Sequence, residues 1–236
     1  MIKNVVVTGS AQGIGFNITN TFAKKGFRVF ALDIKPQKFE NSNIICYKVD
    51  LRKEEEIKDV FDKIKKEYGS LHILINNAAA SGFHKSIYDI TTEEFDNVIS
   101  INLRGYFICA KEFIKANKGE SYGRIINIAS TRYNQNEAEW EAYGASKGGV
   151  VSLTNTLCVS LSETPITVNA ISPGWIEVKD YDGLTDEDHK QHPSGRVGKP
   201  SDIARACLFF CEEENDFING ANLIIDGGMT KKMIYI

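Results

Sequence analysis

The sequence predicts an α/β fold: one domain, residues 1–236, with a doubly wound parallel β-sheet between two layers of helices. Short apolar runs rich in β-branched residues alternate with longer segments whose apolar residues recur every three or four positions. The first run leads directly into a glycine-rich turn that opens a helical pattern. No internal repeat or linker-like tract interrupts the alternation, so one large core accounts for the whole chain.

The first unit is a strand, a turn and a helix. Residues 3–8 are apolar without polar alternation, as expected for a strand buried on both faces. The turn is Gly9-Ser10-Ala11-Gln12-Gly13-Ile14-Gly15, and the helical pattern after it ends near Gly26. Glycines let the backbone approach a pyrophosphate, and the helix N-terminus offers free N–H groups and a positive dipole end. This unit predicts a dinucleotide site.

The second strand, residues 27–33, ends in Asp33. Asp33 follows Gly15 at close to the spacing of about 20 residues at which an acid binds the adenosine ribose. A carboxylate there repels a 2′-phosphate, and the glycine turn contains no arginine to offset it. Asp33 therefore favours NAD over NADP, although an acid can also simply end a strand.

Further elements alternate along the rest of the chain. A T-x-x-E capping box at Thr91 predicts a long helix that reaches about Ala116. This helix includes Asn102, an amide amid apolar residues, whose role is either structural or functional. The other predicted strands are 44–49, 71–75, 124–130, 167–172 and 222–226, and the other helices carry 57–68, the segment from about Ala142, and 200–211. Ligands bind such sheets beyond the carboxyl ends of the strands.

Tyr143 and Lys147 are four residues apart in the segment Tyr143-Gly144-Ala145-Ser146-Lys147. On a helix this spacing places both side chains on one face. A free phenol titrates near pKa ~10, and a neighbouring ammonium stabilises the phenolate and lowers that pKa. The pair predicts an acid–base group that works at neutral pH. The alternative is an ordinary amphipathic helix with a surface lysine.

Composition excludes several classes of protein. A net charge of −3 without any cluster of Lys and Arg argues against nucleic acid, and no apolar run approaches the ~20 residues that span a membrane. The chain begins with a strand pattern, which leaves no room for a signal peptide. The five cysteines have no C-x-x-C spacing, so we expect no metal site and a reduced, cytoplasmic protein.

Taken together, these motifs closely resemble the short-chain dehydrogenase/reductase family, whose members have a Rossmann fold. The resemblance covers nearly the full chain, in the family's order: Thr8-Gly9-x-x-x-Gly13-x-Gly15, Asp50, Asn76-Asn77-Ala78, Asn102, Ser130, Tyr143-x-x-x-Lys147 and Pro173-Gly174. It implies that Tyr143 is the general acid or base, and that Lys147 lowers its pKa and binds the nicotinamide ribose. It also implies that Ser130 holds the substrate oxygen and that Asn102 anchors a water.

The same resemblance implies which residues contact the cofactor: Gly9, Gln12, Gly13, Ile14, Gly15, Asp33, Asp50, Leu51, Asn77, Ala78, Tyr143, Lys147, Pro173, Gly174 and Ile176. Two positions depart from the family pattern. Ala79 stands where the family has glycine, which should leave cofactor binding intact. Val178 stands where the family has a threonine that contacts the carboxamide, so we expect weaker cofactor affinity.

We therefore expect an NAD-dependent enzyme that interconverts a secondary alcohol and a ketone. The alternatives are a 3-oxoacyl-thioester (acyl carrier protein) reductase that uses NADP, and a non-catalytic NAD-binding protein. The polar segment 177–195 is a candidate substrate lid with surface histidines, and Arg132 pairs either with an anionic substrate or with nearby glutamates. The family implies a homotetramer or homodimer, and the apolar tail 233–236 fits a contact with a second subunit or with the lid.

Overall fold

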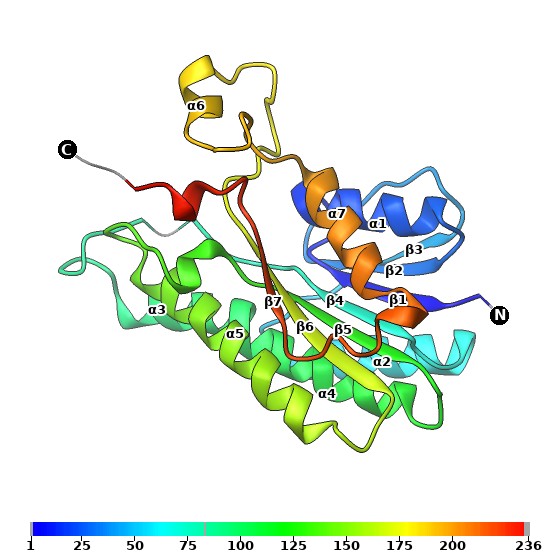
Figure 1. Cartoon of the computed structure of the whole chain (residues 1–236). Helices are drawn as coiled ribbons and strands as arrows, with labels where there is room; N and C mark the ends of the chain where they lie inside the picture. The colour runs from blue at the N-terminus through cyan, green and yellow to red at the C-terminus, as the bar shows by residue number, and fades with distance from the viewer. Residues whose placement is uncertain (1, 83, 234–236) are drawn as a thin grey trace.

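A computed structural model describes residues 2–82 and 84–233. Its seven strands form one parallel sheet in the order β3-β2-β1-β4-β5-β6-β7 (Figure 1). Each predicted strand is present, with its ends within about two residues of the prediction. The strands are β1 (Asn4–Thr8), β2 (Arg28–Asp33), β3 (Ile44–Lys48), β4 (Ile73–Asn76), β5 (Gly123–Ile128), β6 (Ile166–Pro173) and β7 (Asn222–Ile225).

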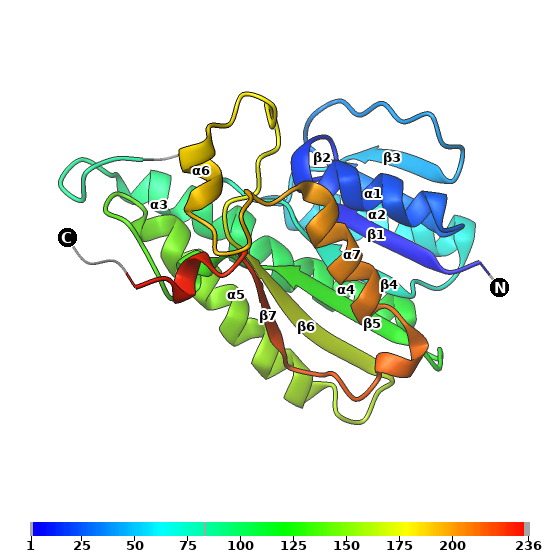
Figure 2. The same cartoon turned by 45° about the horizontal axis from the view of Figure 1, so that its top comes forward.

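Helices cover both faces of the sheet, which confirms the doubly wound fold (Figures 1 and 2). They are α1 (Gly13–Lys24), α2 (Glu54–Tyr68), α3 (Thr92–Ile99), α4 (Gly105–Asn117), α5 (Glu141–Ser160), α6 (Asp186–Lys190) and α7 (Pro200–Phe210). Helices α1 and α7 pack on one face, and α2 and α4 pack on the other. Because both faces are covered, all five residues of β1 are buried, as its apolar run predicted.

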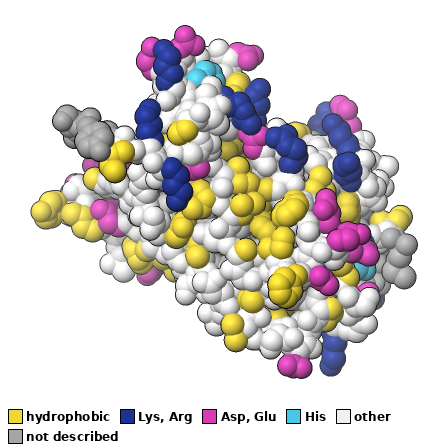
Figure 3. All heavy atoms as spheres, in the orientation of Figure 1, with side chains coloured by type: hydrophobic (Ala, Val, Ile, Leu, Met, Phe, Trp, Pro, Cys, Tyr) yellow, Lys and Arg dark blue, Asp and Glu magenta, His cyan; other side chains and the backbone are white. Residues whose placement is uncertain are grey.

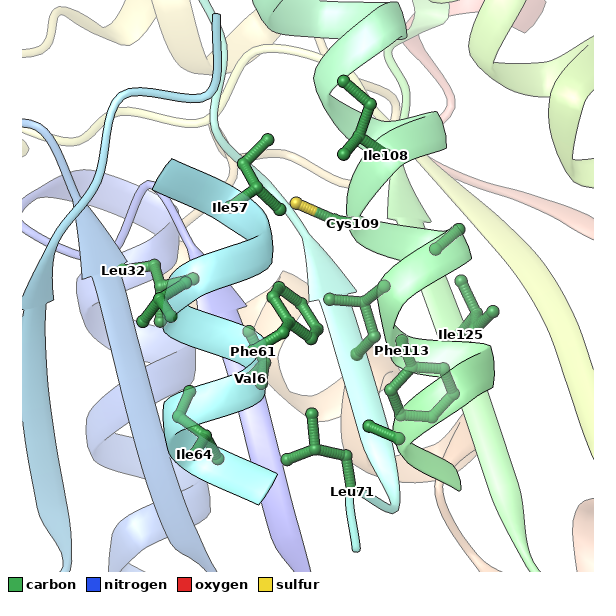
Figure 4. Close-up of a cluster of buried hydrophobic side chains, with 14 of the residues drawn as sticks. Val6, Leu32, Ile57, Phe61, Ile64, Leu71, Ile108, Cys109, Phe113 and Ile125 are labelled. Atoms are coloured by element: carbon green, nitrogen blue, oxygen red, sulfur yellow. The ribbon is translucent and has the colours of Figure 1, made fainter. Parts of the chain in front are cut away.

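The core between the sheet and helices α2 and α4 is drawn in Figure 4. Phe61 of α2 and Phe113 of α4 lie over Val6 and Ile125 of the strands, in one cluster of buried side chains. Aromatic and branched side chains of this size contribute roughly 1.5–3 kcal/mol each when fully buried. This packing holds the carboxyl ends of β1, β4 and β5 in fixed positions.

The helix predicted from Thr91 to about Ala116 is interrupted. Thr91 forms the predicted capping box with Glu94, but a π-helical segment, Ser100–Arg104, separates α3 from α4. Single π turns of this kind are frequent at functional sites, and the one here contains Asn102. The apolar periodicity did not reveal it, because buried residues keep spacings of three or four through the segment, from Val98 through Asn102 and Tyr106 to Cys109.

The sheet has its topological switch between β1 and β4. Strand β1 pairs with β2 on one side and with β4 on the other, so the turns after β1 and β4 border one crevice. The 177–195 segment, with the short helix α6, projects beyond this carboxyl edge (Figures 1 and 2). Near the end of the described chain, Lys232 Nζ donates to the carbonyl oxygen of Lys190 in this segment, at 3.1 Å. Residues 234–236 of the predicted tail lie outside the described residues.

Candidate active site

The glycine-rich turn after β1 is locked to the turn after β4. Asn77 Nδ2 donates to the carbonyl oxygens of Thr8 and Gly9, at 3.0 Å each. In return, Thr8 Oγ1 accepts from the backbone N–H groups of Asn77 at 3.0 Å and Ala78 at 3.1 Å. The two turns at the switch point therefore form one rigid frame, which holds Asn77 and Ala78 beside the glycine turn.

This frame fits the pyrophosphate of a dinucleotide. Gly9 and Gly13 have φ of +67° and +58°, a conformation that other residues rarely adopt. A Cβ on Gly9 would lie 2.6 Å from Ala78 Cα, and one on Gly15 would overlap the carbonyl oxygen of Gly9. The backbone is thus bare where α1 begins, and the first N–H groups of a helix attract anions.

A cavity of about 510 Å³ opens beside this turn. It is lined by nine of the predicted cofactor residues: Gly9, Gln12, Gly13, Ile14, Asp33, Asp50, Leu51, Asn77 and Ala78. Gly15 lies beneath the turn, and Pro173 and Ile176 line neither this cavity nor the larger one described below. The residues present therefore fit the adenosine and pyrophosphate portions of the cofactor.

Asp33 ends β2 and Asp50 follows β3, and both acids line this cavity. The Asp33 carboxylate accepts from the backbone N–H groups of Ala11 at 2.9 Å and Lys35 at 2.8 Å, which aims it at the glycine turn. Arg52 donates to Asp50 through Nε at 2.9 Å and through Nη2 at 2.6 Å. The Arg52 guanidinium holds the pKa of Asp50 below its usual range, so Asp50 stays ionised.

Asn102 is fully buried, and its side chain forms hydrogen bonds with two distant parts of the chain. Its Oδ1 accepts from the Ala80 N–H at 2.7 Å, and its Nδ2 donates to the Ala80 carbonyl at 3.1 Å and to Ser146 Oγ at 3.0 Å. The amide therefore joins the π segment, the turn after β4 and helix α5. These contacts support the structural alternative for Asn102. Through Ser146, they also connect Asn102 to the residue that precedes Lys147 on α5.

Ser130 lies close to Tyr143 and lines the larger cavity, whose volume is about 780 Å³. Ser130 follows β5 and lines this cavity with Arg132, Gly174 and Trp175. Burial raises the pKa of Tyr143, while a hydrogen bond with Ser130 and the charge of Arg132 act in the opposite direction. The structure thus brings the predicted serine and tyrosine together.

Lys147 is 1% exposed, and its Nζ donates to the carbonyl oxygen of Ile128 at 2.7 Å. Burial lowers the pKa of Lys147 to about 7. The sequence predicted that Lys147 lowers the pKa of Tyr143, but the overall direction of the pKa here is upward. The physical reason is that both side chains are enclosed, so the loss of water outweighs their proximity, with Nζ 5.6 Å from the centre of the Tyr143 ring.

Arg132 is held by its own loop. It donates to Glu137 at 2.8 Å, and its guanidinium lies 3.8 Å from the centre of the Trp140 ring. Of the two predicted partners, the nearby glutamate is therefore the one it contacts. Trp140 in turn stands edge-on to the Tyr143 ring, at 5.4 Å between centroids, so this loop shapes the surroundings of the tyrosine.

Residues 9–230 match the family model described as enoyl-(acyl carrier protein) reductase. This match covers most of the chain, including the glycine turn and the Ser130, Tyr143 and Lys147 side chains described above. The chain belongs to the short-chain dehydrogenase/reductase family. It is 42% identical to an uncharacterized oxidoreductase from Thermotoga maritima, over 99% of this chain and 98% of that protein. It is 36% identical to an NAD-dependent glycerol dehydrogenase from Listeria innocua, over 98% and 94% of the two chains.

A solved structure of an apo SCOR enzyme from Clostridium thermocellum has the same fold, with a TM-score of 0.92. It is 36% identical and the match covers 100% of this chain and 96% of that one. This short-chain dehydrogenase/reductase is therefore an oxidoreductase with a nicotinamide-cofactor site. Within the residues that the structure describes, no helix combines the length and apolar character needed to cross a membrane.

Some features of this short-chain dehydrogenase/reductase were not predicted. Lys35 Nζ donates to Gln12 Oε1 at 3.1 Å, which brings a positive charge to the glycine turn. His192, expected at the surface, is 2% exposed because it packs near Trp175, at 6.1 Å between ring centroids. A signal for Lys35 was present: it lies two residues after Asp33, at the end of the same strand.

The two positions that depart from the family pattern, Ala79 and Val178, both line the cofactor cavity but differ in their surroundings. Ala79 lines the cofactor cavity without strain, since Glu139 is the one non-glycine residue with positive φ among those described. Val178 lines the same cavity, with Cγ1 3.4 Å from the point where a Cβ on Gly13 would lie. Its backbone N–H donates to the Glu177 carboxylate at 3.0 Å, so that group is already engaged.

Proposed function

We propose that this protein is an NAD(H)-dependent enzyme that interconverts a secondary alcohol and a ketone. The observation that carries the proposal is that Ser130, which lines the larger cavity, lies close to Tyr143, with Lys147 one helical turn farther along α5. The bound cofactor would supply or accept the hydride at the carbinol carbon. The chain supplies a proton donor, a hydrogen bond to the substrate oxygen and a water-poor setting.

In this proposal, Tyr143 donates its phenolic proton to the carbonyl oxygen during reduction and takes the hydroxyl proton during oxidation. The C–H bond of the alcohol breaks as its hydride leaves, and the O–H proton passes to the phenolate. Ser130 donates to the substrate oxygen, which stabilises the charge that develops there. Lys147, held at Ile128, provides the positive charge behind Tyr143 when it is protonated.

The test is the variant Tyr143→Phe, assayed with any alcohol or ketone that the parent turns over. General acid–base catalysis contributes typically about 10²–10⁴-fold, so kcat should fall by that order while NADH still binds. The variant Tyr133→Phe, at the end of the turn after Ser130, is the matched control and should retain activity. Undiminished turnover in Tyr143→Phe would remove the tyrosine from the mechanism.

NAD as the preferred cofactor rests on the Asp33 carboxylate beside the glycine turn. The glycerol dehydrogenase of Listeria innocua, which is NAD-dependent by its name, supports this assignment. The second candidate is a 3-oxoacyl-thioester reductase that uses NADP, and two observations favour it: Lys35 at the glycine turn, and the acyl carrier protein named in the family description. Fluorescence titration with NADH and NADPH separates the two, since tighter NADPH binding contradicts our assignment.

A non-catalytic NAD-binding protein is the remaining alternative. The presence of Ser130, Tyr143 and Lys147 together argues against it. A panel of polyols, sugars, hydroxy acids, steroids and short ketones with NAD(H) tests it directly. Clear NADH binding without turnover of any of them would favour the non-catalytic protein. Turnover of one class would also identify the substrate class. We propose that the substrate is selected by the 177–195 segment and by the loop that contains Arg132.

We also propose that the protein is a homodimer or homotetramer. Apolar atoms gather on the face formed by α7 and β7 (Figure 3), where Phe209 is 43% exposed and Leu223 is 38% exposed. Contiguous apolar surface of this kind marks association sites. Size-exclusion chromatography with light scattering measures the state, and the variant Leu223→Arg should lower it. A monomeric parent would contradict the proposal.

A further inference from the structure

Lys147 has two oxygen neighbours behind the catalytic tyrosine. One is the carbonyl oxygen of Ile128, at 2.7 Å from Nζ. The other is the phenol oxygen of Tyr106, at 3.5 Å, a weaker contact by its length. Among the described residues, no carboxylate forms an ion pair with Lys147. These two oxygens therefore take the place of the water that the ammonium loses on burial.

The carbonyl of Ile128 is free for this purpose because of its place in the sheet. The ladder between β4 and β5 ends with the pair Asn76 and Asn127, one residue before Ile128. Beyond that pair, the backbone N–H of Ala78, which would extend β4, donates to Thr8 Oγ1 instead. The oxygen at the end of β5 is thus left to side chains.

Tyr106 approaches the same oxygen from another helix. It lies in the first turn of α4, directly after the π segment, and is 0% exposed. Its hydroxyl donates to the Ile128 carbonyl at 3.3 Å. Because the phenolic hydrogen points to Ile128, the lone pairs of the phenol oxygen are available to the Lys147 ammonium. Burial raises the pKa of Tyr106 well above its ordinary value, so the phenol keeps this hydrogen throughout the working pH range.

We propose that Tyr106 is a positioning residue for the reaction, whose phenol oxygen holds Lys147 at the Ile128 carbonyl and favours its charged form. The proposal rests on the proposed function, since it assigns Tyr106 an effect on the acid–base pair of that site. The titratable groups that face Lys147 are Tyr143 on its own helix and Tyr106 on α4. Tyr106 stays neutral, so the phenol dipole supports the ammonium without competing for its proton.

The direct test needs no turnover. The pKa of Lys147 is read by NMR titration of protein labelled with ¹³C at the lysine ε carbon, with Lys147→Met to identify its signal. Loss of a hydrogen-bond acceptor in Tyr106→Phe should lower that pKa by about 0.5–1 unit. The matched control is Tyr122→Phe, which removes a half-buried phenol that donates to the Cys211 carbonyl at 2.6 Å near the opposite end of β5. Equal pKa values for Lys147 in the parent and in Tyr106→Phe would overturn the proposal.

A second measurement follows the reaction. A Lys147 that loses its charge more readily gives less support to the Tyr143 phenolate, so the pH at which alcohol oxidation reaches half its maximum should rise in Tyr106→Phe by about 0.5–1 unit. Tyr122→Phe should keep the parent's profile even if both variants lose thermal stability. A shift in the titration with no turnover by the parent would contradict the proposed function alone. An unchanged profile in an active Tyr106→Phe would contradict the role of Tyr106.

Discussion

The Lys147 ammonium lies 2.7 Å from the carbonyl oxygen of Ile128, the last residue of β5, and Ser130 follows two residues later. The carboxyl end of β5 therefore holds both the lysine and the serine of the candidate site. Helix α5 brings Tyr143 and Lys147 to that end from the other side. The site is thus a junction of one strand end with one helix face.

Stability should depend on pH through Lys147. Its pKa in the folded chain is about 7, below the ordinary value of 10.5, so between these two pH values the unfolded chain binds more protons. Stability should therefore rise with pH over this window, and the contribution of Lys147 is most unfavourable at pH 7 and below. Urea unfolding from pH 6 to 10 checks this: Lys147→Met should show a flatter slope than the parent and abolish catalysis. Parallel slopes for the two proteins would contradict the burial argument.

Gly15 should tolerate no side chain. A Cβ there overlaps the carbonyl oxygen of Gly9 and the amide of Asn77, so the turn that faces the pyrophosphate must shift. We expect Gly15→Ala to weaken NADH binding by about tenfold or more, which corresponds to roughly 1.4 kcal/mol. Fluorescence titration measures it. Gly82→Ala is the control, because nothing lies within 4 Å of a Cβ at that position; equal affinities for the two variants would refute the prediction.

Asp33 and Lys35 should act in opposite directions on cofactor choice. The Asp33 carboxylate faces the glycine turn, whereas the Lys35 ammonium contacts Gln12 of the same turn. Asp33→Ser should weaken NADH binding about tenfold or more, since hydrogen bonds to a charged group contribute roughly 1.5–3 kcal/mol, and should improve NADPH binding. Lys35→Ala should weaken NADPH binding and spare NADH. Titration of both cofactors against each variant decides, and an unchanged ratio in Asp33→Ser would count against Asp33 as the selector.

Asn102 should be a stability residue as well as a site residue. Its amide makes three hydrogen bonds, to Ala80 and Ser146, and Asn102 itself is fully buried. Asn102→Ala leaves those partners unsatisfied, which should cost about 1–3 kcal/mol in the free energy of unfolding. Asn97→Ala, on the surface of α3, is the control and should cost less than about 0.5 kcal/mol. Denaturant unfolding of both variants gives the comparison; similar losses would mean that the junction at Asn102 is not specially stabilising.

Much of the fold could be predicted because its signals are local. The run at residues 3–8, the glycine turn and the Tyr143–Lys147 spacing each follow from neighbouring residues, and the order of these motifs implied a parallel sheet. Parallel strands bring their carboxyl ends to one edge, so the meeting of Ser130 and Tyr143 could be expected. The π segment at Asn102 could not, because buried residues keep helical spacings of three or four on both sides of it.

The sequence by itself thus determined the sheet, the nucleotide turn and the chemical types at the site. Only the tertiary structure decided that Lys35 reaches the glycine turn, that Tyr106 joins Lys147 at Ile128, and that the pKa of Tyr143 is raised. The reason is that burial and charge–charge distances depend on elements far apart in the chain: Tyr106 and Lys147 are 41 residues apart and meet only when α4 and α5 pack against the end of β5.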